Sequence, residues 1–525
     1  MTIRLALLWC VLPAIASAAP AAEPLPRHVV VVVWDGMRPD FISAETTPNL
    51  WALVQRGVFF ASHHPVYPSA TEINGTALAT GAYPGHSTVV GNKEFRPAID
   101  PQKAIGMEKP ESVRRGDAIS HDHYLAVPTL AELLHTQGLR TAVAGSKQVA
   151  LLHDRLLRPD DPASSPVVFE GDAMPAGLKP ALAARLGDFP AIGKNAATGK
   201  DLEKAARDAW TTGALVDVLW QDGVPPYSLL WLAEPDFSQH NTAPGSPQSL
   251  AAIRSSDGNL GRVLTELERR GLGASTDLFI VSDHGFSTIQ TVSDIATDLS
   301  KAGFNATRVP LGGLQPGQVM VLSNGGSVFL YVGGHDPGIV RRIAFWMQTK
   351  EWAGVIFTRT PFEGTFALGE AHLDSPGAPD LIVSLRWSLG RNSFGVPGMM
   401  MSDLSDRGVG EGNHGSLSAA DMHNTLVAVG PDFRAGLRDT LPSANTDLAP
   451  TILWLLGFKA EAAKMDGRVL GEALTVDAPP LKTSEPKRLT ARRETVAGTW
   501  EQYLQVSEVN GVRYLDEGNG AWTAH

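Results

Sequence analysis

The sequence has almost no cysteine, since its 525 residues contain only Cys10. Cys10 lies in an apolar N-terminal stretch that is expected to be removed, so the mature chain would contain no cysteine. A framework of disulfide bonds is therefore excluded, and the stability of the folded chain has to come from its hydrophobic core.

The sequence also lacks a second long apolar run and an excess of positive charge. Beyond the N-terminal stretch, no run is long enough to form a transmembrane helix. The 44 Lys and Arg residues against 55 Asp and Glu residues give a net charge of −11. A nucleic-acid-binding surface or a face for anionic lipid is therefore not expected, and an anionic substrate would have to meet local positive charge or metal ions.

The N-terminus has the features of a secretory signal peptide. One Arg precedes an apolar run over residues 5–15, and Ala16-Ser17-Ala18 follows with the small residues of a cleavage site. We therefore predict a signal peptide over residues 1–18 and an exported protein, either periplasmic or secreted.

Hydrophobic content of 43% is typical of a globular protein, and apolar runs alternate with helical patterns along the chain. The run HVVVVVWDG is apolar on both faces, as in a strand that is covered on both sides. The alternation predicts an α/β fold, a doubly wound, mostly parallel sheet flanked by helices.

Three segments interrupt this alternation. Residues 92–122 are polar and irregular, and residues 288–410 predict a smaller α+β subdomain inserted into a catalytic domain over residues 27–474. Residues 475–525 predict a linker and a C-terminal β-hairpin extension, with Asn510-Gly511 and Asn519-Gly520 as its turns.

Acidic and histidine residues follow several predicted strands, where the carboxyl ends of a parallel sheet form ligand sites. Taken singly, they have simpler interpretations: a turn or a helix cap for a strand-end Asp, an i,i+4 pair on a helix, and a loop histidine. Together they predict two metal ions with mixed carboxylate and imidazole ligands, zinc first, with manganese or iron as alternatives. The set comprises Asp35, Asp236, His240, Asp283, His284 and His414.

Thr71 is the candidate nucleophile. Pro68 keeps the preceding residues extended, and a run of small residues predicts a helix that begins near Thr71. The amino end of a helix favours an anion, and a metal-bound hydroxyl there can attack phosphorus. Taken alone, Thr71 could instead be a helix N-cap, with Ser69 as the alternative hydroxyl.

The order of these motifs resembles the alkaline phosphatase superfamily and, within it, the type I phosphodiesterase/nucleotide pyrophosphatase family. The chain shows a strand ending in Asp-Gly, a TPNL helix, a Thr at a helix head, TGAYPGH with Asn92 shortly after, Asp-x-x-x-His, Ser-Asp-His-Gly and a final His-Gly. The resemblance covers residues 29–457. Sulfatases are disfavoured because their Cys/Ser-x-Pro-x-Arg motif does not follow the first strand.

The resemblance implies a role for each site residue. One zinc would be held by Asp236, His240 and His414, and the other by Asp35, Asp283, His284 and the Thr71 hydroxyl. Thr71 would form a covalent phospho-threonine intermediate, which a zinc-activated water hydrolyses. The Asn92 side chain and the Thr71 backbone N–H would hold the non-bridging oxygens of a phosphate ester or nucleotide substrate.

The sequence departs from the family around the nucleophile. Family diesterases often read Lys-Thr-Phe-Pro-Asn, whereas this chain reads SATEIN, which leaves Glu72 without an assigned role. Lys147 follows a predicted strand and is either a substrate-binding residue or a solvated lysine at a helix start.

The predicted function is a two-zinc phosphodiesterase or nucleotide pyrophosphatase. Alternatives are a phosphomonoesterase or phosphonate hydrolase on the same fold, which contact of Lys147 with the site would favour, and a non-catalytic phosphate-binding protein.

Overall fold

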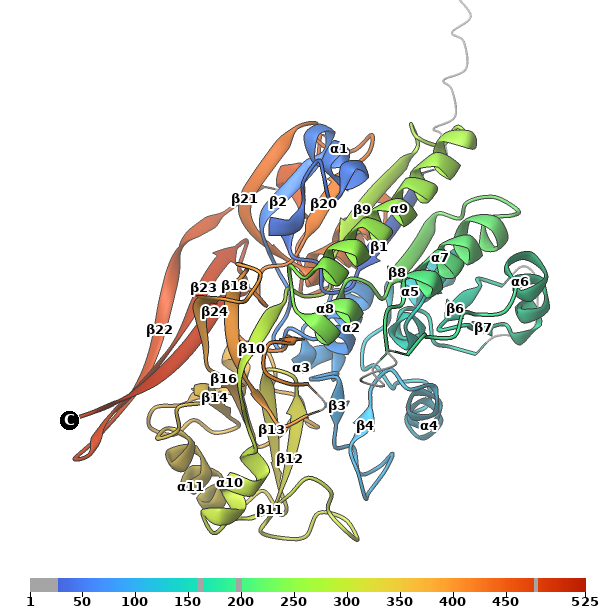
Figure 1. Ribbon diagram of the computed structural model, residues 1–525. Coiled ribbons are helices and arrows are strands. Elements are labelled where there is room, and N and C mark those ends of the chain that lie inside the picture. Colours follow the sequence, from blue (N-terminus) through green and yellow to red (C-terminus); the bar gives the residue numbers. More distant parts are fainter. Residues whose placement is uncertain (1–26, 158–163, 195–200, 406, 476–479) are drawn as a thin grey trace, which may run out of the picture.

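The computed structural model describes residues 27–525 except 158–163, 195–200, 406 and 476–479 (Figure 1). The predicted signal peptide lies outside the described residues. Among the helices of the described part, none is both long and apolar enough to cross a membrane.

A nine-stranded sheet forms the centre of the fold. Most of its neighbouring strands are parallel, while β20 pairs antiparallel with both of its neighbours and β7 with β6. The predicted doubly wound, mostly parallel α/β fold is thereby confirmed. In spatial order the strands are β21 (Leu437–Ala444), β2 (Val58–His64), β20 (Leu426–Val429), β9 (Thr276–Val281), β1 (His28–Trp34), β8 (Tyr227–Leu232), β5 (Thr141–Gly145), β6 (Val167–Phe169) and β7 (Asp172–Met174).

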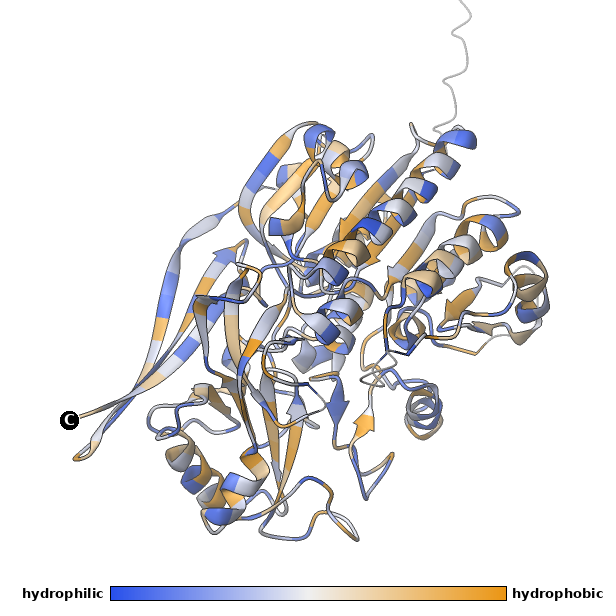
Figure 2. Ribbon diagram, in the orientation of Figure 1, coloured by the Kyte–Doolittle hydropathy of each residue, from blue (hydrophilic) through white to orange (hydrophobic). Residues whose placement is uncertain are grey.

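Both faces of the central sheet are covered. Alternate residues of β1 pack into two hydrophobic clusters, one on each face of the sheet. Val30 and Val32 belong to one cluster, and Val29 and Val31 belong to the other, which is the main cluster. In Figure 2 the central strands β1 and β9 are largely hydrophobic, whereas α9 alternates in hydropathy. The Val30 face packs against α1 (Pro48–Arg56), α7 (Ala205–Gly213) and α9 (Pro247–Arg269), and the Val29 face against α2 (Thr71–Thr80), α5 (Leu130–Thr136) and α12 (Leu448–Leu455).

The segment predicted as an inserted subdomain contains most of two further sheets, of which only β19 and the first residue of β10 lie outside residues 288–410. A six-stranded sheet packs against α10 (Ile295–Lys301) and α11 (Pro337–Met347) around its own apolar cluster. Its strands are β11 (Asn305–Thr307), β12 (Gln318–Asn324), β13 (Ser327–Val332), β16 (Leu381–Leu385), β14 (Ala353–Thr358) and β15 (Phe366–Ala367). A four-stranded sheet consists of β17 (Trp387–Arg391), β18 (Pro397–Asp403), β10 (Ser287–Ser293) and β19 (Gly412–Asn413).

The segment 92–122 is less irregular than predicted. It contains the short strands β3 (Lys93–Glu94) and β4 (Ile105–Gly106) and the helix α4 (Pro110–Ser120). Val113 of α4 is fully buried in the main cluster, so α4 is held by packing although its sequence is polar overall.

The C-terminal part forms a three-stranded antiparallel sheet of β22 (Thr483–Thr495), β23 (Gly498–Val509) and β24 (Val512–Ala524). Asn510 and Gly511 make the turn between β23 and β24, both with positive φ, as a two-residue hairpin requires. The second predicted turn is wrong, because Asn519 and Gly520 lie within β24 and pair with β23. Much of the predicted linker is the strand β22.

Candidate active site

The acidic site residues follow three adjacent strands of the central sheet. β1 pairs in parallel with both β8 and β9, which brings Trp34 opposite Leu232 and Val33 opposite Val281. The segments that follow β1, β8 and β9 therefore leave the sheet at the same edge. Asp35 comes directly after β1, Asp236 begins α8 (Asp236–Thr242) shortly after β8, and Asp283 follows β9.

His414 reaches the same place from a distant part of the chain. β10 leaves the sheet edge soon after His284, and β19 pairs antiparallel with it, with Ser287 opposite Asn413. His414 follows β19 directly, and its ring stacks on that of His284 with centroids 3.6 Å apart. The structure thus brings the predicted ligands of both metals together.

Two overlapping groups of side chains could hold a metal ion, and in each group the potential ligand atoms lie within 4.8 Å of one another. Asp236, His240 and His414 form the first group, which is the predicted ligand set of one zinc. The second group contains Asp35, Asp236 and His284. Asp236 therefore faces both positions, a feature that the sequence did not predict. Asp283 adjoins the second group, with its Oδ2 3.3 Å from His284 Nε2.

All three histidines present Nε2 to the centre of the site. His240 Nδ1 lies 3.0 Å from Gly412 O, His284 Nδ1 2.8 Å from Gly285 O and His414 Nδ1 2.9 Å from Ser69 O. A carbonyl only accepts hydrogen bonds, so each Nδ1 carries the proton and each Nε2 has a free lone pair. This is the usual arrangement of metal-binding histidines.

The carboxylates of the site also present oxygens that could bind a metal ion. Asp35 Oδ1, Asp236 Oδ1 and Asp283 Oδ2 are buried and accept no hydrogen bond from the described residues. Burial, with repulsion from Asp283, raises the pKa of Asp35 well above its usual range, and burial raises the pKa of Asp283 to about 7. Buried carboxylate oxygens without donors need a partner such as a cation, so the residues present fit a pair of divalent metal ions.

Burial also acts on the imidazoles. Burial lowers the pKa of His240. Burial and the neighbouring rings of His284 and His240 lower the pKa of His414 far below its usual value. Neutral imidazole is the form that binds metal. His240 Nε2 and His414 Nε2 are only 3.1 Å apart, and an ion between them would satisfy both lone pairs.

Thr71 is the first residue of α2, and the preceding Ala70 occupies the N-cap position. Its Oγ1 lies 3.3 Å from His284 Nε2, so the hydroxyl borders the second group of ligands. The hydroxyls near Thr71 in sequence donate to backbone carbonyls away from the cluster, since Thr76 donates to Glu72 O, Thr80 to Thr76 O and Ser69 to Ser416 O. Among them, Thr71 is the one that faces the acidic and histidine cluster.

Asn92 lies beside the head of the same helix. Its Oδ1 accepts a hydrogen bond of 3.0 Å from the Glu72 backbone N–H. That bond orients the carboxamide so that its nitrogen is available for another acceptor. The geometry places Asn92 next to Thr71, as the sequence predicts.

Lys147 enters the centre of the site. Its Nζ is 2.8 Å from Asp35 Oδ2, 3.2 Å from Asp236 Oδ2 and 3.4 Å from Thr71 Oγ1. Burial alone would lower the pKa of Lys147, but Asp236 and Asp35 raise it well above its usual value. Lys147 is therefore a largely buried cation, 14% exposed, between the two groups of ligands, and not a solvated lysine.

Sequence reasoning missed two neighbours of the site. Trp231, on β8, donates its indole N–H to Asp35 Oδ2 over 2.9 Å. Glu108, from the segment between β4 and α4, approaches Glu72 and Lys147 closely enough to affect the pKa of both. The apolar strand YSLLWL gives no reason to single out its tryptophan, and Glu108 lies in a segment without a recognisable motif.

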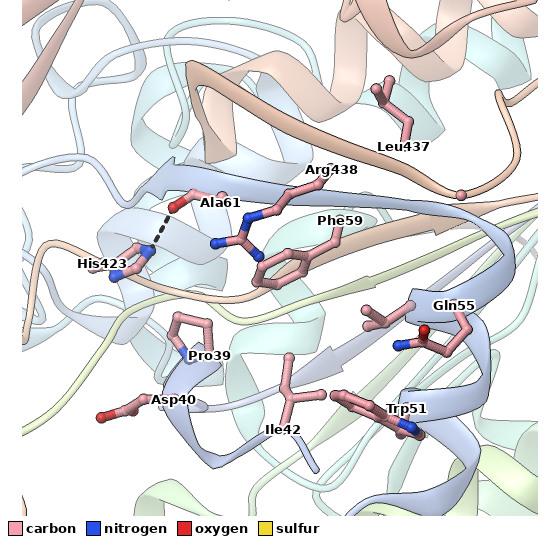
Figure 3. Close-up of a pocket in the computed structure, with 12 residues that line it drawn as sticks. Pro39, Asp40, Ile42, Trp51, Gln55, Phe59, Ala61, His423, Leu437 and Arg438 are labelled. Carbon is pink, nitrogen blue, oxygen red and sulfur yellow. Dashed lines mark hydrogen bonds between the residues drawn. The ribbon is translucent and has the colours of Figure 1, made fainter. Parts of the chain in front are cut away.

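A separate hollow of about 490 Å³ lies between α1, β2 and β21 (Figure 3). Its walls include Trp51, Phe59 and Arg438, whose guanidinium lies 5.0 Å from the centre of the Phe59 ring. None of the nine predicted site residues lines it. Its size therefore does not make it the candidate active site.

The matches to known sequences agree with the site. A sequence profile described as type I phosphodiesterase/nucleotide pyrophosphatase matches residues 29–384. Human ectonucleotide pyrophosphatase/phosphodiesterase family member 1 is 23% identical over 255 residues, 48% of this chain and 22% of its own length. An uncharacterized pyrophosphatase/phosphodiesterase of Schizosaccharomyces pombe is 36% identical over 74 residues, 14% of this chain and 15% of its own. The chain thus matches less than a quarter of the length of either relative.

Solved structures share the fold. Murine ectonucleotide pyrophosphatase/phosphodiesterase 5 superposes with a TM-score of 0.56 at 17% identity, covering 82% of this chain and 95% of that one. An inactive threonine-to-alanine variant of the same murine protein, in complex with AMP, gives 0.53 at 18% identity with the same coverage.

Proposed function

Because the chain belongs to the type I phosphodiesterase/nucleotide pyrophosphatase family, we propose that it is a two-metal hydrolase of phosphate diesters or nucleotide pyrophosphates that acts through Thr71. The match over residues 29–384 confirms the resemblance carried by the sequence motifs. The observation that carries the proposal is the convergence of three histidine Nε2 atoms and three unpartnered carboxylate oxygens in one cluster, with the Thr71 hydroxyl 3.3 Å from His284 Nε2.

The family resemblance implies the ligand sets, and the grouping of Asp236, His240 and His414 and of Asp35 and His284 supports them. Asp236, His240 and His414 would hold one ion, and Asp35, Asp283, His284 and Thr71 Oγ1 the other. Zinc suits these mixed nitrogen and oxygen ligands, with manganese or iron as alternatives. When bound, the ions supply positive charge for the phosphate oxygens and activate the attacking hydroxyl.

The residues of the chain then have separate tasks. Thr71 Oγ1 forms the new bond to phosphorus as the ester alcohol leaves, and water later cleaves the phospho-threonine, so phosphorus undergoes two inversions. The carboxamide nitrogen of Asn92 and the backbone N–H at the head of α2 would hold the non-bridging oxygens. Such positioning with fixed donors is the main requirement of phosphoryl transfer.

The role of Thr71 is supported by the relative that lost activity with a threonine-to-alanine change and binds AMP. The same relative supports a nucleotide as the substrate of this chain. Its extracellular character, implied by the prefix in its name, also agrees with the export that residues 1–18 predict, and we propose a periplasmic or secreted enzyme.

Lys147 favours a second candidate. Its Nζ is 3.4 Å from Thr71 Oγ1, where it could meet the additional charge of a phosphomonoester or a carboxylated phosphonate. Turnover of bis(p-nitrophenyl) phosphate, p-nitrophenyl phosphate and phosphonoacetate separates the candidates. We expect the diester to be preferred, and a clear preference for the monoester would favour the second candidate.

The same assay tests catalysis itself. Thr71→Ala is expected to lose nearly all turnover while it still binds two zinc ions, and chelators should abolish turnover of the wild-type enzyme. A near wild-type rate in Thr71→Ala would refute the nucleophile. If the zinc-loaded protein turned over none of the three compounds, a non-catalytic phosphate-binding protein would be the better account.

A further inference from the structure

Asn445 is a fully buried amide between α2 and the segment that follows β9. It comes directly after β21. Its Nδ2 donates to the backbone carbonyl of Asp283 over 2.7 Å and to Asn74 Oδ1 over 2.9 Å. Asp283 adjoins the second group of ligands, and Asn74 lies on α2, whose first residue is Thr71. A single side chain therefore joins the element of the candidate nucleophile to the segment of a candidate metal ligand.

Asn74 extends this link to the residues before Thr71. Its Oδ1 also accepts a hydrogen bond of 2.8 Å from the Val66 N–H. Its Nδ2 donates to Val66 O over 3.1 Å and to Ala70 O over 3.0 Å. Asn74 therefore fixes both ends of residues 66–70 against the start of α2. The place of Thr71 depends on that segment, because Ala70 is the N-cap residue of α2.

The carboxamide of Asn445 is held in one orientation. Its Oδ1 accepts hydrogen bonds from His63 Nε2 over 3.0 Å and from Asn424 Nδ2 over 3.2 Å. All four hydrogen-bonding positions of the carboxamide are therefore used. A flipped carboxamide would place its oxygen against Asp283 O, so the surrounding groups permit only the observed orientation. Asn424 Nδ2 also donates to Ser282 O, so amides hold two successive carbonyls after β9.

We propose that Asn445 is a positioning residue, which fixes the Thr71 hydroxyl relative to the candidate metal ligands that follow β9. Thr71 Oγ1 lies 3.3 Å from Nε2 of His284, the residue after Asp283, so a displacement of α2 relative to this segment would change that distance directly. Misplacement of a reacting group by about 1 Å can lower a rate about 10²-fold. Asn445 acts through Asn74 and Asp283 and not by contact with the substrate. This role rests on the proposed function of Thr71.

The variants Asn445→Ala and Asn445→Ser test this role. Alanine removes both donors, and serine has a single O–H, which cannot donate to Asp283 O and Asn74 Oδ1 together. In the alanine variant, kcat for bis(p-nitrophenyl) phosphate is expected to fall roughly 10- to 100-fold while KM stays unchanged. The serine variant is expected to fall between alanine and the wild type, and it takes the place of the alanine variant if that protein does not fold.

Thr451→Val is the matched control for lost stability. Thr451 is also fully buried and lies on α12, close to Asn445 in sequence. Its Oγ1 donates to Asp447 O over 2.7 Å and accepts from the Leu470 N–H over 3.0 Å, and these bonds involve neither α2 nor the metal ligands. Thr451→Val is expected to lower Tm but, at a temperature well below the Tm of every variant, to leave kcat unchanged. An equal loss of kcat in Thr451→Val, or a wild-type kcat in the Asn445 variants, would overturn the positioning role.

Amide hydrogen exchange provides a measurement that needs no turnover. The amides of residues 66–74 are expected to exchange faster in the Asn445 variants than in Thr451→Val, because the Asn74 side chain loses its link to Asp283. Equal exchange in the Asn445 variants and the control would overturn the positioning role. If the wild-type protein cleaved no ester, the proposed function would fail instead, and the exchange of residues 66–74 would still decide whether Asn445 holds the start of α2 in place.

Discussion

Lys147 is predicted to stabilise the protein in the absence of metal and to become less important when metal is bound. Its Nζ lies 2.8 Å from Asp35 Oδ2 and 3.2 Å from Asp236 Oδ2. At an effective dielectric constant of about 20, each such pair corresponds to roughly 5–6 kcal/mol of attraction, which desolvation of the charges partly offsets. Removing one partner of a buried ion pair usually destabilises a protein by about 3–5 kcal/mol.

The substitution Lys147→Met keeps much of the apolar side chain and removes the ammonium. In chelator-treated protein it should lower Tm by several degrees, because Asp35 and Asp236 lose their buried counter-charge. Zinc supplies that charge, so the rise in Tm on adding zinc should be larger in the variant than in the wild type. Both values can be measured by scanning calorimetry, without reference to catalytic activity.

Lys109→Met provides the matched control. Lys109 is an exposed lysine near the site whose Nζ donates to Gln148 Oε1 and forms no ion pair with a metal-ligand carboxylate among the described residues. It should change Tm little, with or without zinc. Equal zinc-induced shifts in wild type and Lys147→Met would refute the assignment of Lys147 as the internal counter-charge of the metal-free site.

Three further perturbations test other parts of the structure. Asn92→Ala should lower kcat about 10²- to 10³-fold with zinc content unchanged, and an unaltered rate would place Asn92 outside the reaction. Trp231→Phe removes the donor to Asp35 Oδ2 and should weaken zinc binding roughly 10- to 100-fold in competition with a chelating dye; unchanged affinity would contradict this. Burial and Asp432 raise the pKa of Asp277 to about 8 from 3.8, so the folded chain keeps a proton that the unfolded chain releases, and stability falls as pH rises between these values. Asp277→Asn should therefore raise Tm more at pH 8 than at pH 5, and an equal change at both would refute this.

Local patterns predict the central sheet well because its strands are buried on both faces. The β1 run HVVVVVW has no polar face, which leaves few alternatives to a covered parallel strand. Residues that directly follow such strands must emerge at one edge. That geometric rule is enough to bring Asp35, Asp236 and Asp283 together before any distance is known.

The C-terminal strands show where local patterns fail. Asn519-Gly520 reads as a turn, yet its pairing with Gln502 and Tyr503 keeps β24 extended through both residues. β22 is polar and largely exposed, so its sequence resembles a linker, and only its pairing with β23 makes it a strand. Strand pairing is a tertiary interaction that the local sequence does not encode.

The candidate site was predictable where a motif exists and not where two distant segments meet. The positions of the metal ligands and Thr71 follow from short patterns near strand and helix ends. The electrostatic influence of Glu108 on Lys147 depends on how residues 92–122 fold back towards the site, and the sharing of Asp236 between both groups depends on side-chain direction. Neither has a signal in the sequence.

The short pairing of β10 with β19 has a consequence for how this fold can change. Ser287 lies opposite Asn413 and Thr288 opposite Gly412, so the chain leaves the site and returns to it through a single narrow connection. Nearly all of the two additional sheets lies between those two points. The intervening segment is not passive, however, because its Gly326 N–H donates to His414 O over 2.6 Å and its Ser327 hydroxyl donates to Gly415 O over 2.6 Å. The inserted sheet can therefore vary at its far end, while the turn between β12 and β13 has to be retained to keep His414 in place.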